Sequence, residues 1–314
     1  MLTAFASELG KKLAERWFSL LVLPGALYLA VAAAARELGH GHALDLHRLV
    51  SWLDSLAKSK AADGVGGATV LVLGLLAGAA VAGMAAQGLG TVLERLALAA
   101  EWRRLPAWPR RWVTGRVDGR REEWKTAARE WHRLRQAAAA AAVAGQPHDP
   151  EPRLKALRSM RGVAEEYPDR PTWSGDRLNA SAVRLERDLG LDIAVCWPYL
   201  WLLVPDGERA QLTTVRSDLA RATTLGGWAL LYLPLLVWWW PALPLAAGLA
   251  ITARRRTRAA SDAWARALEA TCRLHLREVA DCLGIDTTAR TAPYALGQEV
   301  TRFLEGSPPP PPVP

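Results

Sequence analysis

Residues 68–90 read ATVLVLGLLAGAAVAGMAAQGLG and contain no charged side chain. A helix needs about twenty apolar residues to cross the roughly 30 Å hydrocarbon core of a bilayer, so this stretch is long enough to span one. Two further uncharged stretches lie at residues 17–35, WFSLLVLPGALYLAVAAAA, and at residues 225–253. Together the three stretches predict an all-α integral membrane protein rather than a soluble domain.

The composition and the placement of charge agree with this prediction. Of the 314 residues, 51% are hydrophobic and 22% are charged, and the formal net charge is +8. A basic chain can bind nucleic acid, but here the basic residues gather beside the uncharged stretches, as they do on the cytoplasmic side of membrane spans. We therefore expect the lipid bilayer, and no nucleic acid, as a partner. These basic residues are Lys11, Lys12, Arg16, Arg103, Arg104, Arg110, Arg111, Arg254, Arg255, Arg256 and Arg258.

The first span is expected at residues 17–36, after an amphipathic cytoplasmic N-terminus at residues 1–16. Pro24 and Gly25 should kink this helix without ending it. A cleaved signal peptide is the alternative, because basic residues precede the apolar stretch. That stretch is longer than the roughly 7 to 15 apolar residues usual in signal peptides, so we favour a retained anchor.

The second span, at residues 68–90, carries a stripe of small residues. Gly74 and Gly78 form a G-x-x-x-G pattern that Ala82 continues. Such a stripe lets a second helix backbone come close, so we expect it to pack against the first span or a second copy of the chain. The alternative is that glycine and alanine are simply frequent in this stretch.

The third uncharged stretch is too long for one upright helix and short for two. A hairpin turning near residues 238–241 would place the arginines at 254–258 on the same side as those at 103–111, as the positive-inside tendency requires. We therefore expect a third span at residues 223–240 and a fourth at 241–253. One tilted helix, or a re-entrant hairpin, is the alternative.

The resulting topology has about four crossings of the inner membrane and both termini in the cytoplasm. Residues 37–67 form an extracytoplasmic loop, and residues 91–222 form a helical cytoplasmic domain. Residues 254–306 are assigned to a cytoplasmic C-terminal helix, and this helix is expected to end near Gly284. The proline-rich tail at 307–314 is expected to be a solvated end, with an SH3-type ligand as the alternative.

Helical periodicity organises the cytoplasmic domain. A long helix is expected at residues 117–144, after interruptions at Leu105–Pro106 and Trp108–Pro109. A second helix at 152–166 should return beside it. Ser174 or Asp176 should cap a further helix that Gly190 closes. The next apolar run is too short to span a bilayer and is rich in aromatic residues. We interpret it as a hydrophobic wedge at the inner membrane surface or in the core beneath, with contacts through Trp197, Tyr199 and Trp201.

One block of the chain resembles a known family. The patterns are PTxxGDRL at residues 171–178, GLD at 190–192, WPxLW at 197–201 and LxP at 203–205. Together they are similar to a block of an uncharacterised family of bacterial multi-pass membrane proteins, where it precedes a paired hydrophobic segment and a C-terminal helix. The similarity covers roughly residues 168–284, and the first half of the chain matches in layout alone. It implies a multi-pass protein without an established activity, loosely associated with bacterial conflict systems.

Candidate site residues are few. His40, His42 and His47 lie close together in the outer loop and could hold a divalent metal with Asp45. Their spacing matches no usual zinc site, so we expect a solvated loop and no cofactor. His275 is expected to be a hydrogen-bonded core residue.

In the cytoplasmic block, Asp176 and Arg177 are the best polar candidates, and we expect them to form a helix cap with a local ion pair. Cys196, Cys272 and Cys282 form no metal-ligand spacing and are expected to be buried.

The sequence favours a non-catalytic function. The common hydrolase, zinc-protease, nucleotide-binding and dinucleotide-binding motifs do not occur, and the spans lack the charged residues that transporters use. We expect a membrane-anchored interaction or scaffold protein that binds a cytoplasmic protein or a second copy of itself. The first alternative is a membrane-perturbing or channel-forming effector. The second is an enzyme that acts on a lipid or envelope substrate at the outer loop.

Overall fold

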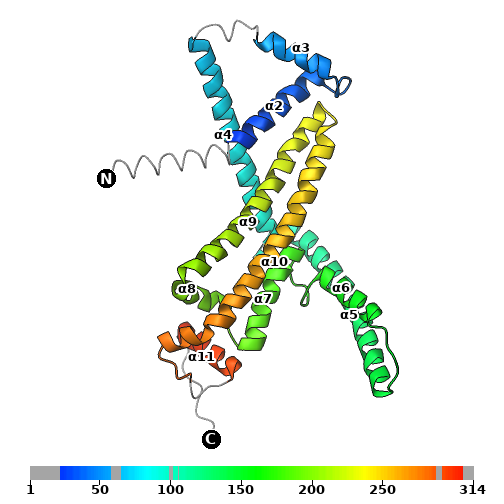
Figure 1. Ribbon diagram of the computed structural model, residues 1–314, viewed down its shortest axis with the longest axis vertical. Coiled ribbons are helices and arrows are strands. Elements are labelled where there is room, and N and C mark those ends of the chain that lie inside the picture. The colour runs from blue at the N-terminus through cyan, green and yellow to red at the C-terminus, as the bar shows by residue number, and fades with distance from the viewer. Residues whose placement is uncertain (1–21, 58–64, 99–101, 105, 288–291, 307–314) are drawn as a thin grey trace. The chain divides into compact units, whose positions relative to one another are not determined.

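The computed structural model describes residues 22–57, 65–98, 102–104, 106–287 and 292–306 (Figure 1). These residues form helices and connecting turns, with no strand among them, which confirms the all-α prediction. The chain divides into two compact units. Unit 1 comprises Met1–Glu94 and Ala220–Arg256, and unit 2 comprises Arg95–Leu219 and Thr257–Pro314.

Unit 1 is built from apolar helices. Because α4, α9 and α10 are long, each contributes residues to both units. The described elements of unit 1 are α2 (Leu23–Leu38), α3 (Leu46–Ala57), the first part of α4 (Val65–Leu98), the end of α9 (Asp206–Tyr232), the 3-10 helix η4 (Leu233–Val237) and the start of α10 (Ala242–Cys282).

The first predicted span is described only in part. α2 begins at Leu23 with Pro24 in its first turn, where a missing backbone N–H costs no helical hydrogen bond. The predictions for residues 1–16, for the kink in a longer helix and for the tail at 307–314 concern residues outside the described ranges. The 16-residue α2 ends at Leu38, close to the predicted end of this span at residue 36.

Small residues let the helices of unit 1 approach closely. A Cβ added at Gly25 would lie 2.0 Å from the carbonyl oxygen of Ala79, and one at Gly227 would lie 2.1 Å from that of Ala86. Helices α2 and α9 therefore both press their backbones against α4. The structure places Gly78 against the Leu29 side chain, whereas no described atom lies within 4 Å of a Cβ at Gly74.

A turn at residues 238–241 joins α9 and η4 to α10. Beyond the turn the two limbs pack together, because Tyr232 and Leu235 share a buried cluster with Ala242 and Ala246. The turn falls where the hairpin was predicted. After the turn, α10 continues without a break for 41 residues.

Unit 2 is also helical, and it carries most of the charged side chains. One predicted boundary was wrong, because the long helix begins at residue 107 rather than 117. The proline at position 109 falls in the first helical turn, where it interrupts nothing. Beside parts of α4, α9 and α10, unit 2 contains η3 (Trp102–Arg104), α5 (Ala107–Val143), α6 (Glu151–Val163), α7 (Trp173–Leu189), α8 (Ile193–Leu203) and α11 (Pro293–Glu305).

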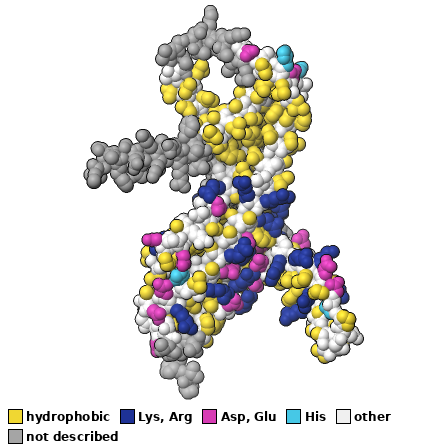
Figure 2. Space-filling view, viewed as in Figure 1, with side chains coloured by type: hydrophobic (Ala, Val, Ile, Leu, Met, Phe, Trp, Pro, Cys, Tyr) yellow, Lys and Arg dark blue, Asp and Glu magenta, His cyan; other side chains and the backbone are white. Residues whose placement is uncertain are grey.

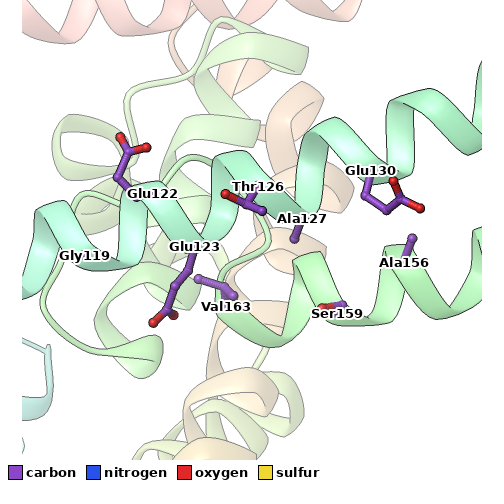
Figure 3. Close-up of a pocket in the computed structure, with 9 residues that line it drawn as sticks. All are labelled: Gly119, Glu122, Glu123, Thr126, Ala127, Glu130, Ala156, Ser159 and Val163. Atoms are coloured by element: carbon purple, nitrogen blue, oxygen red, sulfur yellow. The ribbon is translucent and has the colours of Figure 1, made fainter.

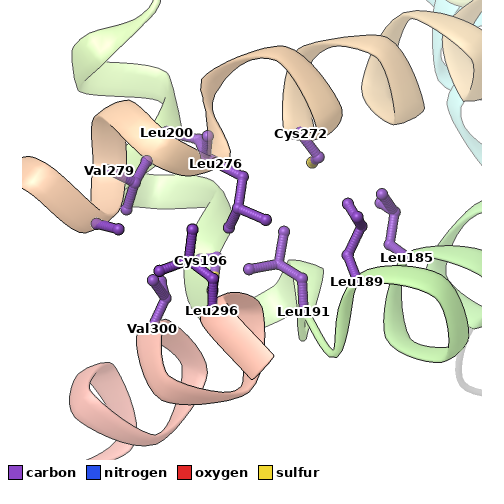
Figure 4. Packing of buried hydrophobic residues seen from close by; sticks show 11 residues of the cluster. Leu185, Leu189, Leu191, Cys196, Leu200, Cys272, Leu276, Val279, Leu296 and Val300 are labelled. Atoms are coloured by element: carbon purple, nitrogen blue, oxygen red, sulfur yellow. The ribbon is translucent and has the colours of Figure 1, made fainter. Parts of the chain in front are cut away.

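The largest buried cluster of the described residues lies in unit 2, where α7, α8, α10 and α11 meet (Figure 4). Close packing against α11 depends on Gly297, because a Cβ there would lie 1.9 Å from the carbonyl oxygen of Leu189. Cys196 and Cys272 are buried in this cluster as predicted, but Cys282 is exposed at the end of α10. The cluster consists of Leu185, Leu189, Leu191, Cys196, Leu200, Cys272, Leu276, Val279, Ala280, Leu296 and Val300.

Candidate functional site

The PTxxGDRL block, residues 171–178, lies where several helices of unit 2 meet. Thr172 caps α7 by accepting a hydrogen bond from the backbone N–H of Gly175, at 3.0 Å. Its hydroxyl also donates to the carbonyl oxygen of Ala97 at the end of α4. A Cβ at Gly175 would lie 2.6 Å from the carbonyl oxygen of Leu98, so only glycine fits here. The cap is thus Thr172, and the predicted caps, Ser174 and Asp176, were wrong.

Asp176 holds the loop before α7 against α5. Its Oδ1 accepts hydrogen bonds from the backbone N–H groups of Asp169 and Arg170, at 2.8 and 2.7 Å. Its Oδ2 accepts from a guanidinium nitrogen of Arg120 at 2.7 Å. Burial raises the pKa of this carboxyl, while the Arg120 guanidinium and the two backbone donors oppose the rise. The Asp176 side chain therefore has a structural role, because its oxygens accept hydrogen bonds that hold the loop and α5 together.

Arg177 joins α7 to α10. Its side chain is 3% exposed, its Nε lies 2.7 Å from Asp262, and its Nη1 lies 3.0 Å from Glu269. Burial alone would lower the pKa of Arg177, but the hydrogen bonds to these carboxylates outweigh burial and raise it. The predicted local ion pair of Asp176 with Arg177 was wrong, because each side chain bonds partners on other segments.

We call Thr172, Gly175, Asp176 and Arg177 the joint. Through these four residues the end of α4, the helices α5, α7 and α10, and the loop before α7 are tied into one body within unit 2. The structure therefore explains the polar and glycine positions of the block by packing. Their partners on α4, α5 and α10 lie at least 56 residues away, so no local sequence pattern could have identified those partners.

The predicted wedge is only partly exposed. Trp197 packs against the core cluster of unit 2 and meets Trp264 edge to face, with ring centroids 6.2 Å apart. Trp201 lies beside Trp197 and under the guanidinium of Arg209. Of the three predicted residues only Tyr199 is exposed, at 44%. The neighbouring Leu202, which the sequence reasoning missed, is 75% exposed. One face of α8 thus packs into the core of unit 2, and the other face is exposed and could contact a partner.

Two of the three histidines in the predicted outer loop have separate partners in unit 1. His40 Nε2 lies 3.1 Å from the carbonyl oxygen of Val237, and His42 Nδ1 lies 3.0 Å from the guanidinium of Arg48. Asp45 accepts a hydrogen bond from the backbone N–H of Arg48, which lowers its pKa. No group of three or more His, Cys, Asp or Glu side chains among the described residues is placed to hold a metal. The loop nonetheless borders a hollow of about 360 Å³, which Trp240 of the α9–α10 turn also lines.

A groove of about 620 Å³ runs between α5 and α6, and the sequence reasoning missed it (Figure 3). Glu122, Glu123 and Glu130 line it from α5, and Ala156 and Ser159 line it from α6. The predicted helical hairpin was the only signal that could have located it. Lys125 neutralises Glu122, and Arg133 neutralises Glu130, each at 2.7 Å, so the groove is not strongly acidic.

His275 bridges α9 and α10 within unit 2. Its Nδ1 lies 2.7 Å from Glu278, and its Nε2 lies 3.0 Å from Glu208. The hydrogen bond to Glu208, followed by that to Glu278, raises the pKa of His275. The predicted hydrogen-bonded role is seen, although at the edge of the helix pair rather than in the core.

No family model, curated protein or solved structure matches the chain. The function must therefore be argued from the residues described above.

Proposed function

We propose that the protein is a multi-pass integral membrane protein whose unit 2 is a helical interaction module on the cytoplasmic side. In this proposal unit 1 lies in the lipid and carries α2, α4 and the α9–α10 hairpin. Unit 2 binds a protein partner or a second copy of the chain, and it performs no catalysis.

The observation that carries the proposal is the exposure of the apolar side chains on α4. Residues 69–93 contain no charge, yet Val70, Leu71 and Leu73 are 70%, 52% and 59% exposed. Only 22% of the most apolar window of this helix is buried, whereas the core helix of a soluble protein would be mostly buried. Because each exposed Å² of apolar surface costs about 25 cal/mol in water, lipid is the favourable surroundings for this surface.

Two helices among the described residues are long and apolar enough to cross a membrane, by length and composition. They are Thr69–Leu98 and Asp206–Val237, and the most apolar 18 residues of these helices have mean hydropathies of 2.1 and 1.2. On the face in view, hydrophobic side chains cover unit 1, and basic and acidic side chains gather over unit 2 (Figure 2). This separation supports a division into a lipid-embedded and a water-exposed part.

The α10 limb of the hairpin is the shortest proposed crossing. Its uncharged part, residues 242–253, rises about 18 Å at 1.5 Å per residue, less than the roughly 30 Å hydrocarbon core. We therefore propose that the backbone of Arg254 and its neighbours lies within the hydrocarbon core. Their guanidinium groups extend from there to the lipid headgroups. Local thinning of the bilayer would accommodate the remaining mismatch.

A binding role fits the polar groups of unit 2 better than catalysis does. Asp176 and Arg177 are buried and hydrogen-bonded to other parts of unit 2, so neither side chain is presented to a substrate. The exposed aromatic and aliphatic side chains, Tyr199 and Leu202 on α8 among them, are suited to contact with a partner.

Cysteine labelling in intact cells tests the topology. The variants carry Ser51→Cys on α3 or Ser159→Cys on α6, in a background with Cys282→Ala to remove the exposed native thiol. A membrane-impermeant maleimide should label the first variant from outside and the second only after the cells are opened. Labelling of both positions in intact cells would contradict the proposed sidedness.

A dye-release assay separates the interaction protein from a channel-forming effector. The effector is the second candidate because the open side of α4 at Gly74 could meet another copy in the membrane. Vesicles reconstituted with the full chain should retain their dye as well as protein-free vesicles do. Rapid release at a low protein-to-lipid ratio would contradict the non-channel assignment.

A further inference from the structure

The start of α5 presents two tryptophan side chains away from the protein. Trp108 is 87% exposed and Trp112 is 71% exposed. They are four residues apart in one helix and so lie on the same face. Val113 and Val117 turn the other way and are buried against Trp102. The exposure of the two indoles is therefore a property of this face and not of a poorly packed helix.

Two arginines accompany these tryptophans. Arg110 and Arg111 are exposed, and within the described residues neither forms an ion pair with a carboxylate. Farther along α5, Arg133 does form such a pair, 2.7 Å from Glu130. The first two turns of α5 thus carry unneutralised positive charge beside exposed indole rings.

The same segment is held at the end of the candidate span α4. Ala97 and Leu98, the last residues of that helix within unit 2, contact Thr172 and Gly175. The loop that contains Thr172 also accepts a hydrogen bond from the indole N–H of Trp102, at 2.9 Å from the Asp169 carbonyl oxygen. Since Trp102 packs on Val113, these contacts fix the start of α5 relative to the end of α4.

We propose that the exposed start of α5, which carries Trp108, Arg110, Arg111 and Trp112, binds anionic lipid headgroups at the cytoplasmic surface of the bilayer. The inference rests on the proposed function, since it requires α4 to cross the membrane. Indole rings favour the boundary between hydrocarbon and water, and unpaired arginines favour phosphate, which they bind through two parallel hydrogen bonds. Arg111 is three residues from Trp108 and so lies on the side of the helix that carries the two indoles. This combination matches an anionic lipid surface better than an apolar protein groove does.

Fluorescence quenching by brominated lipids tests this proposal on the full chain. The protein is reconstituted into nanodiscs of phosphatidylcholine that contain brominated phosphatidylglycerol or, at the same mole fraction, brominated phosphatidylcholine. Each arginine near an anionic surface strengthens attachment to that surface by about fivefold. We therefore expect brominated phosphatidylglycerol to quench the tryptophan emission more strongly than brominated phosphatidylcholine does.

Three double variants locate this excess quenching. It should disappear in W108F/W112F, which lacks the reporting indoles, and in R110Q/R111Q, which keeps them but lacks the charges. It should persist in R129Q/R133Q, a matched loss of two exposed arginines from the same helix.

Two results would overturn the inference. One is equal quenching by the two brominated lipids in the unmodified protein, and the other is an excess that survives W108F/W112F or R110Q/R111Q. Neither result affects the membrane assignment itself. That assignment fails instead if neither brominated lipid quenches any tryptophan.

Discussion

The three cysteine side chains differ in their surroundings, and their reactivity should differ accordingly. Burial raises the pKa of Cys196 to about 11 and that of Cys272 to about 12, whereas Cys282 is exposed. Because the thiolate is the reactive form, a maleimide at neutral pH should label one thiol per folded chain and three in denaturant. Mass spectrometry of the labelled chain checks this, and rapid labelling of Cys196 under native conditions would contradict the packing around α8.

Arg177 carries the largest predicted effect of a single substitution. Arg177→Met leaves Asp262 and Glu269 without their buried partner, and loss of one member of a buried pair costs about 3 kcal/mol or more. The control is Arg133→Met, which removes an exposed pair within α5 and should cost under about 0.5 kcal/mol. Thermal unfolding in detergent measures both variants, and equal stability of the two would refute the structural role of the joint.

At this scale the sequence predicted residue types better than their partners. Arg177 and Asp176 stand out in the sequence as polar residues at a helix start. Their ion-pair partners Asp262 on α10 and Arg120 on α5 lie 85 and 56 residues away, beyond any local pattern. Hydrogen bonds between distant segments depend on how helices pack, and periodicity within one helix carries no information about that.

Close helix contact in unit 1 depends on glycine at one crossing of α4 and α9. A methyl group at Gly227 would collide with the Ala86 carbonyl, since its carbon would lie 2.1 Å from the oxygen. Gly227→Ala should therefore separate the helices and destabilise the fold by about 1 to 3 kcal/mol.

Gly74→Ala is the matched control in α4, because nothing described lies within 4 Å of the new methyl group. It should leave stability unchanged or raise it by up to about 1 kcal/mol, as helix propensity predicts. Detergent-resistance or thermal melting curves report both changes. A Gly74→Ala variant as unstable as Gly227→Ala would show that the open side of α4 has a partner.

The bridge from α9 to α10 at His275 should make stability depend on pH. Glu208 and Glu278 raise the pKa of this histidine in the folded chain above its unfolded value of about 6.5. Its contribution to stability is therefore fully present below that unfolded pKa, and it is lost as the pH rises through the raised pKa of the folded state.

Melting temperatures measured from about pH 5.5 to 8.5 should fall more steeply for the unmodified protein than for His275→Gln. Identical slopes would show that the imidazole does not gain a proton on folding.

At the scale of elements, helix type and many boundaries followed from periodicity and end signals. Gly190 closes α7 as predicted, with φ at +63°, and the hairpin turn falls at residues 238–241. The start of α5 was missed because the proline at 109 was taken as a break, although a first helical turn accepts proline. The groove between α5 and α6 depends on side-chain packing between two helices, which neither helix shows alone.

The whole molecule is defined by the contrast between its two units. The described helices of unit 1 expose uncharged apolar side chains, and those of unit 2 hold charged side chains in networks around buried apolar clusters. The sequence predicted this division, because charge and hydropathy change along the chain at nearly the residues where the units meet. It could not predict a partner, since the exposed residues of α8 and α5 lie on faces that only the packing of unit 2 defines.

The behaviour of the purified chain without detergent tests the central claim most directly. The claim is that lipid surrounds the apolar surface of unit 1. After expression, carbonate-washed membranes should retain the chain, and removal of detergent from the purified protein should cause it to aggregate in sedimentation-velocity runs. A monodisperse, folded species of about 34 kDa in plain buffer would contradict the claim.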